Sequence, residues 1–336
     1  GAQNAPPDAA SRHDLLAKVK SWGYQLQKAD PDVIAASPYD LVVIDYSRSG
    51  DDEGRFTPDE VRRMQVKPDG SRRLVLAYLS VGEAEGYRYY WTDDWVETLK
   101  VVVEGDIADE EARNIATAKR PGAQKIKTLR FPRLSAPVWL GRENASWTGN
   151  FFVRYWEKSW QDIIFGGNEG YLERIVAAGF DGAFLDRVDA FYGVTDERTE
   201  GRADMVRLVT ALAARARALN PRFVILPQNG EELLAEPAYL AAIDGIAKED
   251  LLYGNPSEGQ PNPAATIATT TERLMPARRA GHLVLVTEYV LEKDVADRIR
   301  AELAPNGFVP YFGPRTLDES KQAETRTATN GSDSAR

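Results

Sequence analysis

Eight short β-type runs recur along this sequence, and stretches with helical periodicity separate most of them. The runs are Trp22–Gln27, Leu41–Asp45, Leu74–Ser80, Gly182–Leu185, Phe223–Leu226, Gly245–Glu249, Leu283–Val286 and Gly307–Phe312. Helices, or parts of them, are expected at Pro58–Met64, Trp91–Val101, Trp160–Ala178, Ala203–Leu219, Glu231–Ala242, Thr266–Ala280 and Glu292–Leu303. Such alternation indicates parallel βαβ units. Eight units over roughly 290 residues predict an α/β fold, a single (β/α)8 TIM barrel.

A doubly wound open sheet is the alternative fold for alternating strands and helices. It usually binds its ligand at one switch point, beside a glycine-rich phosphate loop. Neither G-x-G-x-x-G nor G-x-x-x-x-G-K-[ST] follows any of the eight runs. The barrel is therefore favoured.

Polar side chains follow most of the runs at the C-terminal end, where a barrel carries its active site. The fourth run ends in Asp186 rather than in a turn glycine, which makes Asp186 the first candidate for a catalytic group. The other polar residues at strand ends are Asp45, Glu83, Gln228, Asn229, Glu249, Asp250, Glu288 and Tyr289.

Composition and charge limit the class of protein and its partners. A chain of 336 residues that is 43% hydrophobic can bury a sizeable core. The sequence contains no run of 18 apolar residues, so no membrane span is predicted. The net charge of −9 argues against nucleic acid as a partner. The sequence points to no particular protein partner.

The small, polar first dozen residues resemble the start of a mature exported protein without its signal peptide, and a cloning remnant is the alternative. We therefore expect a secreted or periplasmic protein. Residues 1–19 are expected to be a flexible arm, residues 20–316 the barrel domain and residues 317–336 a disordered tail.

Cysteine is absent, and His13 and His282 are the only histidines. Disulfides, a thiol nucleophile and thiolate metal sites are excluded, and a Ser-His-Asp triad or a His-rich zinc site is disfavoured. No cofactor and no metal are therefore expected. Two carboxylates flanking a bond are what glycoside hydrolysis needs. Aromatic side chains on which sugar rings could stack crowd the region between the third and fourth runs, and no more than about half of them are expected to contact ligand.

Five motifs in order resemble a known family over about residues 20–313. They are Ser80–Trp91, Trp139–Gly141, Gly179–Asp186, Gln228–Glu231 and Gly245–Tyr253. Together they resemble the endo-α-1,4-polygalactosaminidase-type glycoside hydrolases, family 114. The resemblance implies a (β/α)8 barrel that cleaves polysaccharides containing α-1,4-linked galactosamine or N-acetylgalactosamine. It also implies a catalytic pair, the aspartate that closes the fourth strand and the glutamate of the sixth-strand motif, which fall on Asp186 and Glu249.

Each member of this pair has a structural alternative. Asp186 could pair with Arg187 or cap a helix, and Glu249 could be a loop acid beside Lys248 and Asp250. We expect Asp186 to be nucleophile or base and Glu249 to be general acid/base. A separation of about 5 Å would give retention and one of roughly 6.5–9.5 Å inversion, and both outcomes stay open here.

The substrate-binding candidates and their alternatives surround this pair. Asp45 and Glu83 could bind hydroxyls or an amino group, or could pair with Arg48 or Arg88. Asp189 is weighed equally as a helix cap and as a substrate contact, and Gln228 and Asn229 as hydroxyl ligands or turn residues. Glu288 and Tyr289 could contact an amine, orient Glu249 or form a buried ion pair. The full candidate set is Asp45, Tyr78, Glu83, Arg88, Trp91, Asp189, Gln228, Asn229, Glu288, Tyr289 and Tyr311.

If Asp45, Glu83 and Glu288 face the mouth of the barrel unpaired, their field should favour a polymer with free ammonium groups. Two further functions are considered: hydrolysis of another amino-sugar or neutral glycan, and a carbohydrate-binding barrel without turnover.

Overall fold

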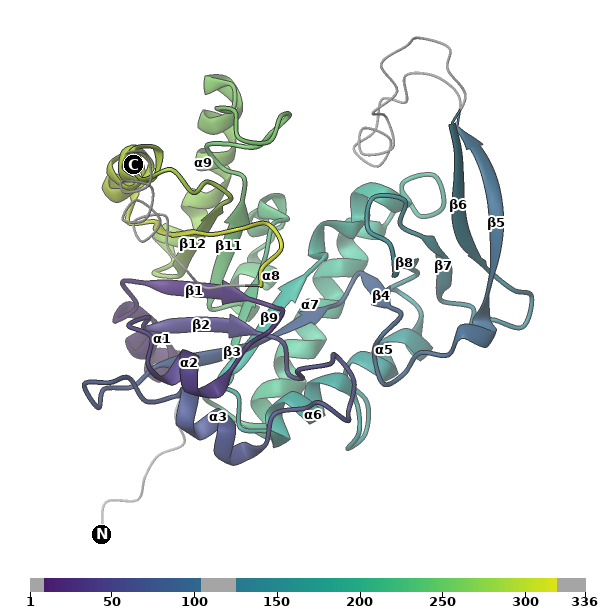
Figure 1. Cartoon of the computed structure of the whole chain (residues 1–336), viewed down its shortest axis with the longest axis horizontal. Helices are drawn as coiled ribbons and strands as arrows, with labels where there is room; N and C mark the ends of the chain where they lie inside the picture. Colours follow the sequence, from purple (N-terminus) through teal and green to yellow (C-terminus); the bar gives the residue numbers. More distant parts are fainter. Residues whose placement is uncertain (1–8, 104–124, 319–336) are drawn as a thin grey trace, which may run out of the picture.

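All eight predicted strands are present and parallel to their neighbours in the computed structural model, which describes residues 9–103 and 125–318 (Figure 1). One sheet has the order β1-β2-β3-β9-β10 and a second has the order β11-β12-β13. The strands of the first sheet are β1 (Trp22–Gln25), β2 (Leu41–Ile44), β3 (Leu74–Ser80), β9 (Gly182–Asp186) and β10 (Val224–Pro227). Those of the second are β11 (Gly245–Glu249), β12 (Leu283–Glu288) and β13 (Val309–Phe312).

The two sheets adjoin at β10 and β11. The amide of Asn229 donates to the carbonyl of Ala247 at 2.8 Å, and the amide of Asp244 donates to that of Ile225 at 2.8 Å. At the other seam, the Trp22 indole donates to the carbonyl of Val309 at 3.0 Å, while the described ladders do not pair β13 with β1. The strand order is that of the predicted (β/α)8 fold, and the described ladders do not form a closed barrel.

The interior between the strands is aromatic. The rings of Trp22 and Tyr24 are stacked with centroids 5.7 Å apart, and Tyr24 lies 5.1 Å from Phe184 and Trp22 5.6 Å from Tyr311. All four side chains are buried. They join β1, β9 and β13 across the interior, so the ends of these strands are held in a fixed relation.

The helices between the strands mostly fall where the sequence predicts them. They are α2 (Pro31–Ala35), α3 (Pro58–Met64), α5 (Lys158–Ile164), α6 (Tyr171–Ala177), α7 (Gly201–Leu219), α8 (Pro237–Ala242), α9 (Ala264–Arg279) and α10 (Lys293–Leu303). In α3, Thr57 and Glu60 form a capping box that satisfies free amides of the first turn. In α7, Met205, Leu208 and Leu212 recur on one buried face.

Two predicted helices are each divided. Trp160–Ala178 is split into α5 and α6 around Gly166 and Gly167; the φ of Gly167 is 59°, which favours glycine and ends a helix. Glu231–Ala242 is split into the 3₁₀ helix η3 (Glu231–Ala235) and α8, where Pro237 begins a new helix.

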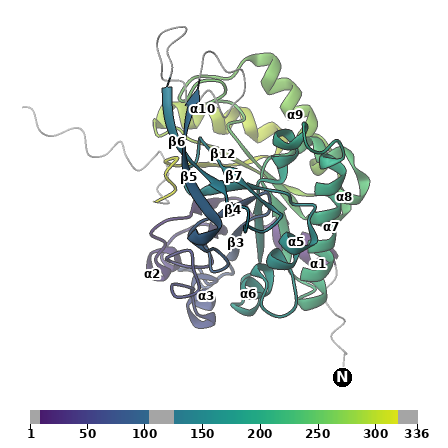
Figure 2. The ribbon, with the colours of Figure 1, turned by 90° about the vertical axis from the view of Figure 1, so that its right-hand side faces the viewer.

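The helix predicted over Trp91–Val101 is wrong. A 3₁₀ turn, η1 (Asp93–Trp95), leads there into strand β5 (Val96–Val103), which pairs antiparallel with β6 (Lys125–Pro132). A second small sheet has the order β4-β8-β7, from Glu83–Glu85, Asn150–Val153 and Leu140–Glu143. These strands form an insertion after β3 that lies beside the parallel strands, on the right in Figure 1 and toward the viewer in Figure 2.

The described ends of the chain pack on the domain. Within the arm expected at residues 1–19, helix α1 (Ala9–Ala17) carries Arg12, which pairs with Asp244 at 3.0 Å, and Leu16, which is buried. At the other end, the carbonyl of Leu317 accepts hydrogen bonds from Leu26 and Gln27. The rest of the expected tail, residues 319–336, lies outside the described residues. No helix in the described part of the chain has the length and apolar character to cross a membrane.

Candidate active site

Asp186 closes β9 and is held by donors from three sides. Gln228, just after β10, donates to its Oδ1 at 3.0 Å, and the Arg187 amide donates to the same oxygen at 2.8 Å. The Tyr78 hydroxyl, from β3, donates to Oδ2. The parallel register sets Ser80 opposite Asp186, which brings Tyr78 alongside this carboxylate. Three donors on one carboxylate stabilise its negative charge.

Glu249 closes β11 and is held by its neighbours on both sides. Asn229 donates from its side-chain amide to Oε2 at 2.9 Å, and its Oδ1 accepts from the Glu249 backbone amide at 3.1 Å. The Tyr289 hydroxyl, just after β12, donates to Oε1. Asn229 has a φ of 61°, so it also has the turn conformation that the sequence analysis considered for it. Lys248 pairs with Glu231 instead of with Glu249.

Asp186 and Glu249 influence each other electrostatically. Burial and then the negative charge of Asp186 raise the pKa of Glu249 to about 7, against the opposing hydrogen bonds of Tyr289 and Asn229. Burial, followed by the charges of Asp186 and Glu249, also raises the pKa of Tyr24 well above its usual value. A carboxyl whose pKa is raised to about neutrality, beside one held by three donors, is an arrangement suited to acid catalysis.

Tyr24 is a member of this site that the sequence did not single out. It lies on β1, two residues after Trp22 and on the same face of the strand. This alternation along β1 is the sequence signal that could have identified Tyr24, because it directs the rings of Trp22 and Tyr24 into the interior between the strands.

Arg187, Glu83 and Asp189 form a charged group beside Asp186. Arg187 pairs with Glu83 at 3.1 Å and with Asp189 at 3.7 Å, and Asn144 donates to Glu83 at 2.7 Å. Burial raises the pKa values of Glu83 and Asp189. Asp189 lies in η2 (Val188–Val194), which has no side-chain cap hydrogen bond. The guanidinium of Arg187 therefore goes to these two acids, and its backbone amide goes to Asp186.

Arg187 reaches this position through an unusual backbone conformation. Its φ is 62°, and its carbonyl packs so closely on Gly82 that a Cβ there would lie 2.1 Å away. Glycine at position 82 therefore lets the segment after β3 pass directly beside the end of β9.

Asp45 and Arg88 lie in a separate buried ion cluster. Arg88 donates to Asp45 at 3.0 Å and to Glu85 at 2.9 Å, and its side chain has no exposed surface. Burial lowers the pKa of Arg88, but the two carboxylates outweigh that effect and hold it well above its usual value. The structure therefore does not bring Asp45 and Arg88 to Asp186 and Glu249 as free groups.

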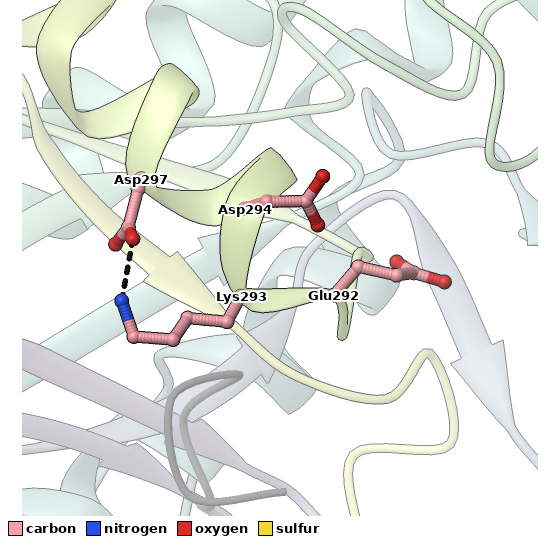
Figure 3. A pocket seen from close by; sticks show the side chains of 4 residues that line it. All are labelled: Glu292, Lys293, Asp294 and Asp297. Carbon is pink, nitrogen blue, oxygen red and sulfur yellow. Dashed lines mark hydrogen bonds and ion pairs between the residues drawn. The ribbon is translucent and has the colours of Figure 1, made fainter. Parts of the chain in front are cut away.

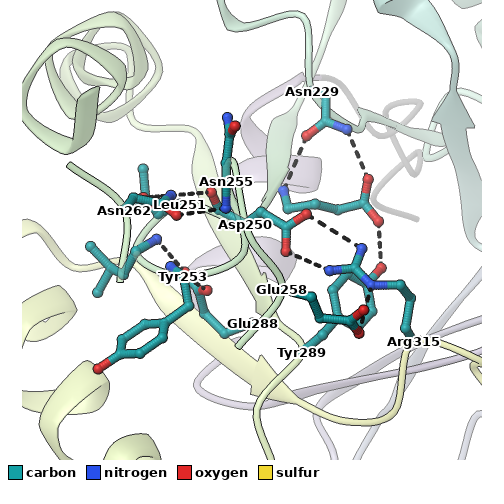
Figure 4. Close-up of polar contacts among 12 residues, drawn as sticks. Asn229, Asp250, Leu251, Tyr253, Asn255, Glu258, Asn262, Glu288, Tyr289 and Arg315 are labelled. Carbon is teal, nitrogen blue, oxygen red and sulfur yellow. Dashed lines mark hydrogen bonds and ion pairs between the residues drawn. The ribbon is translucent and has the colours of Figure 1, made fainter. Parts of the chain in front are cut away.

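Glu288 is also engaged inside the protein. Its residue has no exposed surface, and its two oxygens accept from the amides of Leu252 at 2.7 Å and Tyr253 at 3.2 Å (Figure 4). Burial raises its pKa to about 8, although these amides oppose the shift. Glu288 thus fixes the loop that follows Glu249.

Of the alternatives left open for Asp45, Glu83 and Glu288, these contacts favour pairing within the protein over free charge that faces a substrate. Each acid is paired with an arginine, a side-chain amide or backbone amides within the protein. The sequence left the pairing of Asp45 with Arg88 open, and the partners of Glu83 and Glu288 come from distant segments that it did not indicate.

Trp91 and Tyr311 lie among aromatic neighbours. Trp91 stacks on Phe151 with centroids 4.4 Å apart, and Tyr311 packs against Trp22 in the interior. The substrate-binding candidates Tyr78, Gln228, Asn229 and Tyr289 make direct hydrogen bonds to Asp186 or Glu249.

Two surface hollows are lined by residues other than this pair. One is at the start of α10, where Lys293 pairs with Asp297 across one turn while Glu292 and Asp294 point elsewhere (Figure 3). The other is beside Arg88, lined by Ser49, Asp51, Asp52, Glu53, Gly86, Tyr87, Arg88 and Tyr89. Within residues 9–103 and 125–318, no group of three or more His, Asp or Glu side chains could hold a metal ion.

Comparison with known proteins gives a family and a fold. The profile of Glycoside-hydrolase family GH114 matches residues 102–329. An uncharacterized protein of Deinococcus radiodurans is 33% identical over 330 residues, which is 95% of this chain and 89% of that protein. One of Thermotoga maritima is 31% identical over 312 residues, covering 89% of this chain and 81% of that protein.

Among solved structures, the glycoside hydrolase domain of PelA from Pseudomonas aeruginosa is similar in fold. The match covers 90% of this chain and 97% of that domain, with a TM-score of 0.55 and 18% identity. At this identity the match bears on the fold alone.

Proposed function

The chain belongs to glycoside-hydrolase family GH114, and from this premise we propose that it is an endo-acting hydrolase of polysaccharide containing α-1,4-linked galactosamine or N-acetylgalactosamine. The observation that carries the proposal is the placing of Asp186 and Glu249 at the ends of β9 and β11, close enough for one charge to raise the pKa of the other. We also propose that the eight parallel strands close as a (β/α)8 barrel.

In this mechanism Glu249 is the general acid/base. Its raised pKa keeps a proton available near neutral pH, and the proton goes to the leaving glycosidic oxygen. Asp186, held by Tyr78, Gln228 and the Arg187 amide, acts on the anomeric carbon as a nucleophile or activates water as a base. Tyr289 and Asn229 orient Glu249.

The galactosamine part of the proposal rests on the five sequence motifs. The acids that were expected to attract an ammonium group are paired, so electrostatics adds no support for the amine. Another amino-sugar or neutral glycan is therefore the second candidate substrate.

A substrate screen tests the proposed function. The intact protein is incubated with acetylated and partly de-N-acetylated galactosaminoglycan and with a neutral α-glucan, and products are identified by mass spectrometry. A series of galactosamine-containing oligomers, unchanged by a chelator, is the expected result. Cleavage of the glucan alone would replace the substrate. Binding without products from any polymer would indicate a carbohydrate-binding barrel without turnover.

The pH dependence follows from the pKa of Glu249. Because the acid must be protonated and its pKa is raised to about 7, kcat/KM should fall as pH rises through about 7. Tyr289→Phe removes a hydrogen bond that favours the ionised form, so its alkaline limb should move to higher pH. Initial rates from pH 4 to 9 measure the alkaline limb of the wild type and that of Tyr289→Phe. An alkaline limb near the ordinary glutamate pKa of about 4.3 would remove Glu249 as the acid.

A further inference from the structure

We propose that Arg315, in the segment after β13, is a positioning residue that fixes Glu249 through Tyr289 and Asp250. The inference rests on the proposed function, since it assigns Glu249 a working geometry. Arg315 lies in the last described residues and outside every motif that the sequence singled out.

The first contact of Arg315 is with the tyrosine that holds Glu249. The guanidinium carbon lies 4.1 Å from the centroid of the Tyr289 ring, and the hydroxyl of that ring donates to Glu249 (Figure 4). A planar guanidinium over an aromatic face is favourable and fixes the ring plane. Arg315 thereby limits where the Tyr289 hydroxyl points.

The second contact is with the residue that follows Glu249. Arg315 donates to both oxygens of Asp250, at 3.1 and 3.4 Å (Figure 4). Asp250 has a φ of 51°, a conformation that needs support in a residue with a side chain. A bidentate pair on Asp250 therefore also fixes the backbone leaving Glu249.

Arg315 is itself held on an anchored turn. The amide of Leu317 donates to the carbonyl of Pro314 at 3.1 Å, and the Leu317 carbonyl accepts from Leu26 at 2.8 Å and Gln27 at 3.0 Å, beyond the end of β1. Glu258 also pairs with the guanidinium of Arg315, at 3.4 Å. The turn thus links the end of β1 to the group that holds Glu249.

The charge of Arg315 matters as well as its shape. The titratable groups around Glu249 are Tyr24 from β1, Asp186 from β9, its neighbour Asp250, and Tyr289 after β12. Arg315 offsets the charge of Asp250, whose pKa is raised by burial and lowered by Arg315. Without this cation, the charge of Asp250 would oppose ionisation of Glu249 more strongly.

Arg315→Gln and Arg315→Lys separate shape from charge. In Arg315→Gln we expect kcat/KM to fall about 10- to 100-fold and its alkaline limb to move to higher pH. Arg315→Lys keeps the charge but loses the planar, bidentate contact. The alkaline limb of Arg315→Lys should therefore stay near that of the wild type, while its kcat/KM should still be lower than that of the wild type. Arg273→Gln on α9, which breaks an arginine–carboxylate pair with Glu232 of η3, is the matched control and should leave kcat/KM and its alkaline limb unchanged.

A titration that needs no substrate accompanies the kinetics. The Glu249 carboxyl is followed by NMR in protein with 13C-labelled glutamate and assigned with Glu249→Gln. A higher midpoint in Arg315→Gln than in the wild type supports the proposal, even if no glycan is cleaved and the proposed function fails. A folded Arg315→Gln protein with an unchanged midpoint and kcat/KM within about twofold of the wild type overturns it. A loss of thermal stability without a moved midpoint also overturns it, because the role would then be structural only.

Discussion

Asp186→Asn and Glu249→Gln are each expected to lower kcat by at least about a thousandfold, which corresponds to about 4 kcal/mol of barrier. Each substitution keeps the shape of the side chain and removes its ionisable group. In Asp186→Asn the donors from Tyr78 and Gln228 keep a neutral partner, and in Glu249→Gln the contact with Asn229 can persist. The melting temperature should therefore stay nearly unchanged.

The measurement is initial-rate kinetics on the best polymer of the screen, with circular dichroism melting of each variant. Asp297→Asn is a matched control, because that acid pairs only with exposed Lys293 on α10 among the described contacts. It should keep full activity. Near-normal turnover in either catalytic variant would remove that residue from the mechanism.

The parallel strands could be predicted from sequence because most of them are short, largely apolar runs whose side chains are mainly buried on both faces. Leu74–Ser80 and Gly245–Glu249, for example, have the predicted bounds. Strands of this kind read as continuous hydrophobic runs, and their order along the sheet follows the chain. The order itself placed Asp186 and Glu249 at the same end of the sheets.

The insertion between β3 and β9 could not be predicted in the same way. The run Val96–Val103 pairs with Lys125–Pro132, a partner more than twenty residues away. A short apolar run without a nearby turn signal is ambiguous between helix and strand, and only the distant partner decides. The alternation of strands and helices predicted a helix there, and the pairing with Lys125–Pro132 makes it a strand.

The part of the candidate site that directly follows the strands could be predicted from sequence. Gln228, Asn229 and Tyr289 follow strands directly, so their contacts with Asp186 and Glu249 follow from strand order. Tyr24 reaches the site from the face of β1 that points into the interior, and Arg315 reaches it from the turn after β13. The alternation along β1 could have indicated Tyr24, whereas no spacing in the sequence indicates the approach of Arg315.

Which acids are paired was also beyond the sequence. Asp45 directly follows β2 and could face a substrate, and its partner Arg88, one of the two arginines that the sequence offered as alternatives, comes from the insertion. The same acid can thus be a ligand for a sugar or one half of a buried ion pair. Stability distinguishes the two roles more directly than activity does.

Arg88→Met is expected to lower the free energy of unfolding by about 3–5 kcal/mol, which is roughly 10 °C in melting temperature. The guanidinium is fully buried and pairs with Asp45 and Glu85, and it lies over the Tyr87 and Tyr171 rings at 4.7 and 5.2 Å. Methionine keeps most of the apolar stem but leaves two buried carboxylates without their cation. Urea denaturation of the wild type and the variant measures the difference.

Two further variants show whether the unpaired charge is the cause. Adding Asp45→Asn and Glu85→Gln to Arg88→Met removes both uncompensated charges, so part of the lost stability should return. Arg62→Met, which breaks an exposed pair with Asp59, should change stability by less than about 0.5 kcal/mol. If Arg88 and Asp45 instead bound substrate, Arg88→Met would raise KM and leave the unfolding curve in place. That result would return both residues to the substrate-binding set predicted from the sequence.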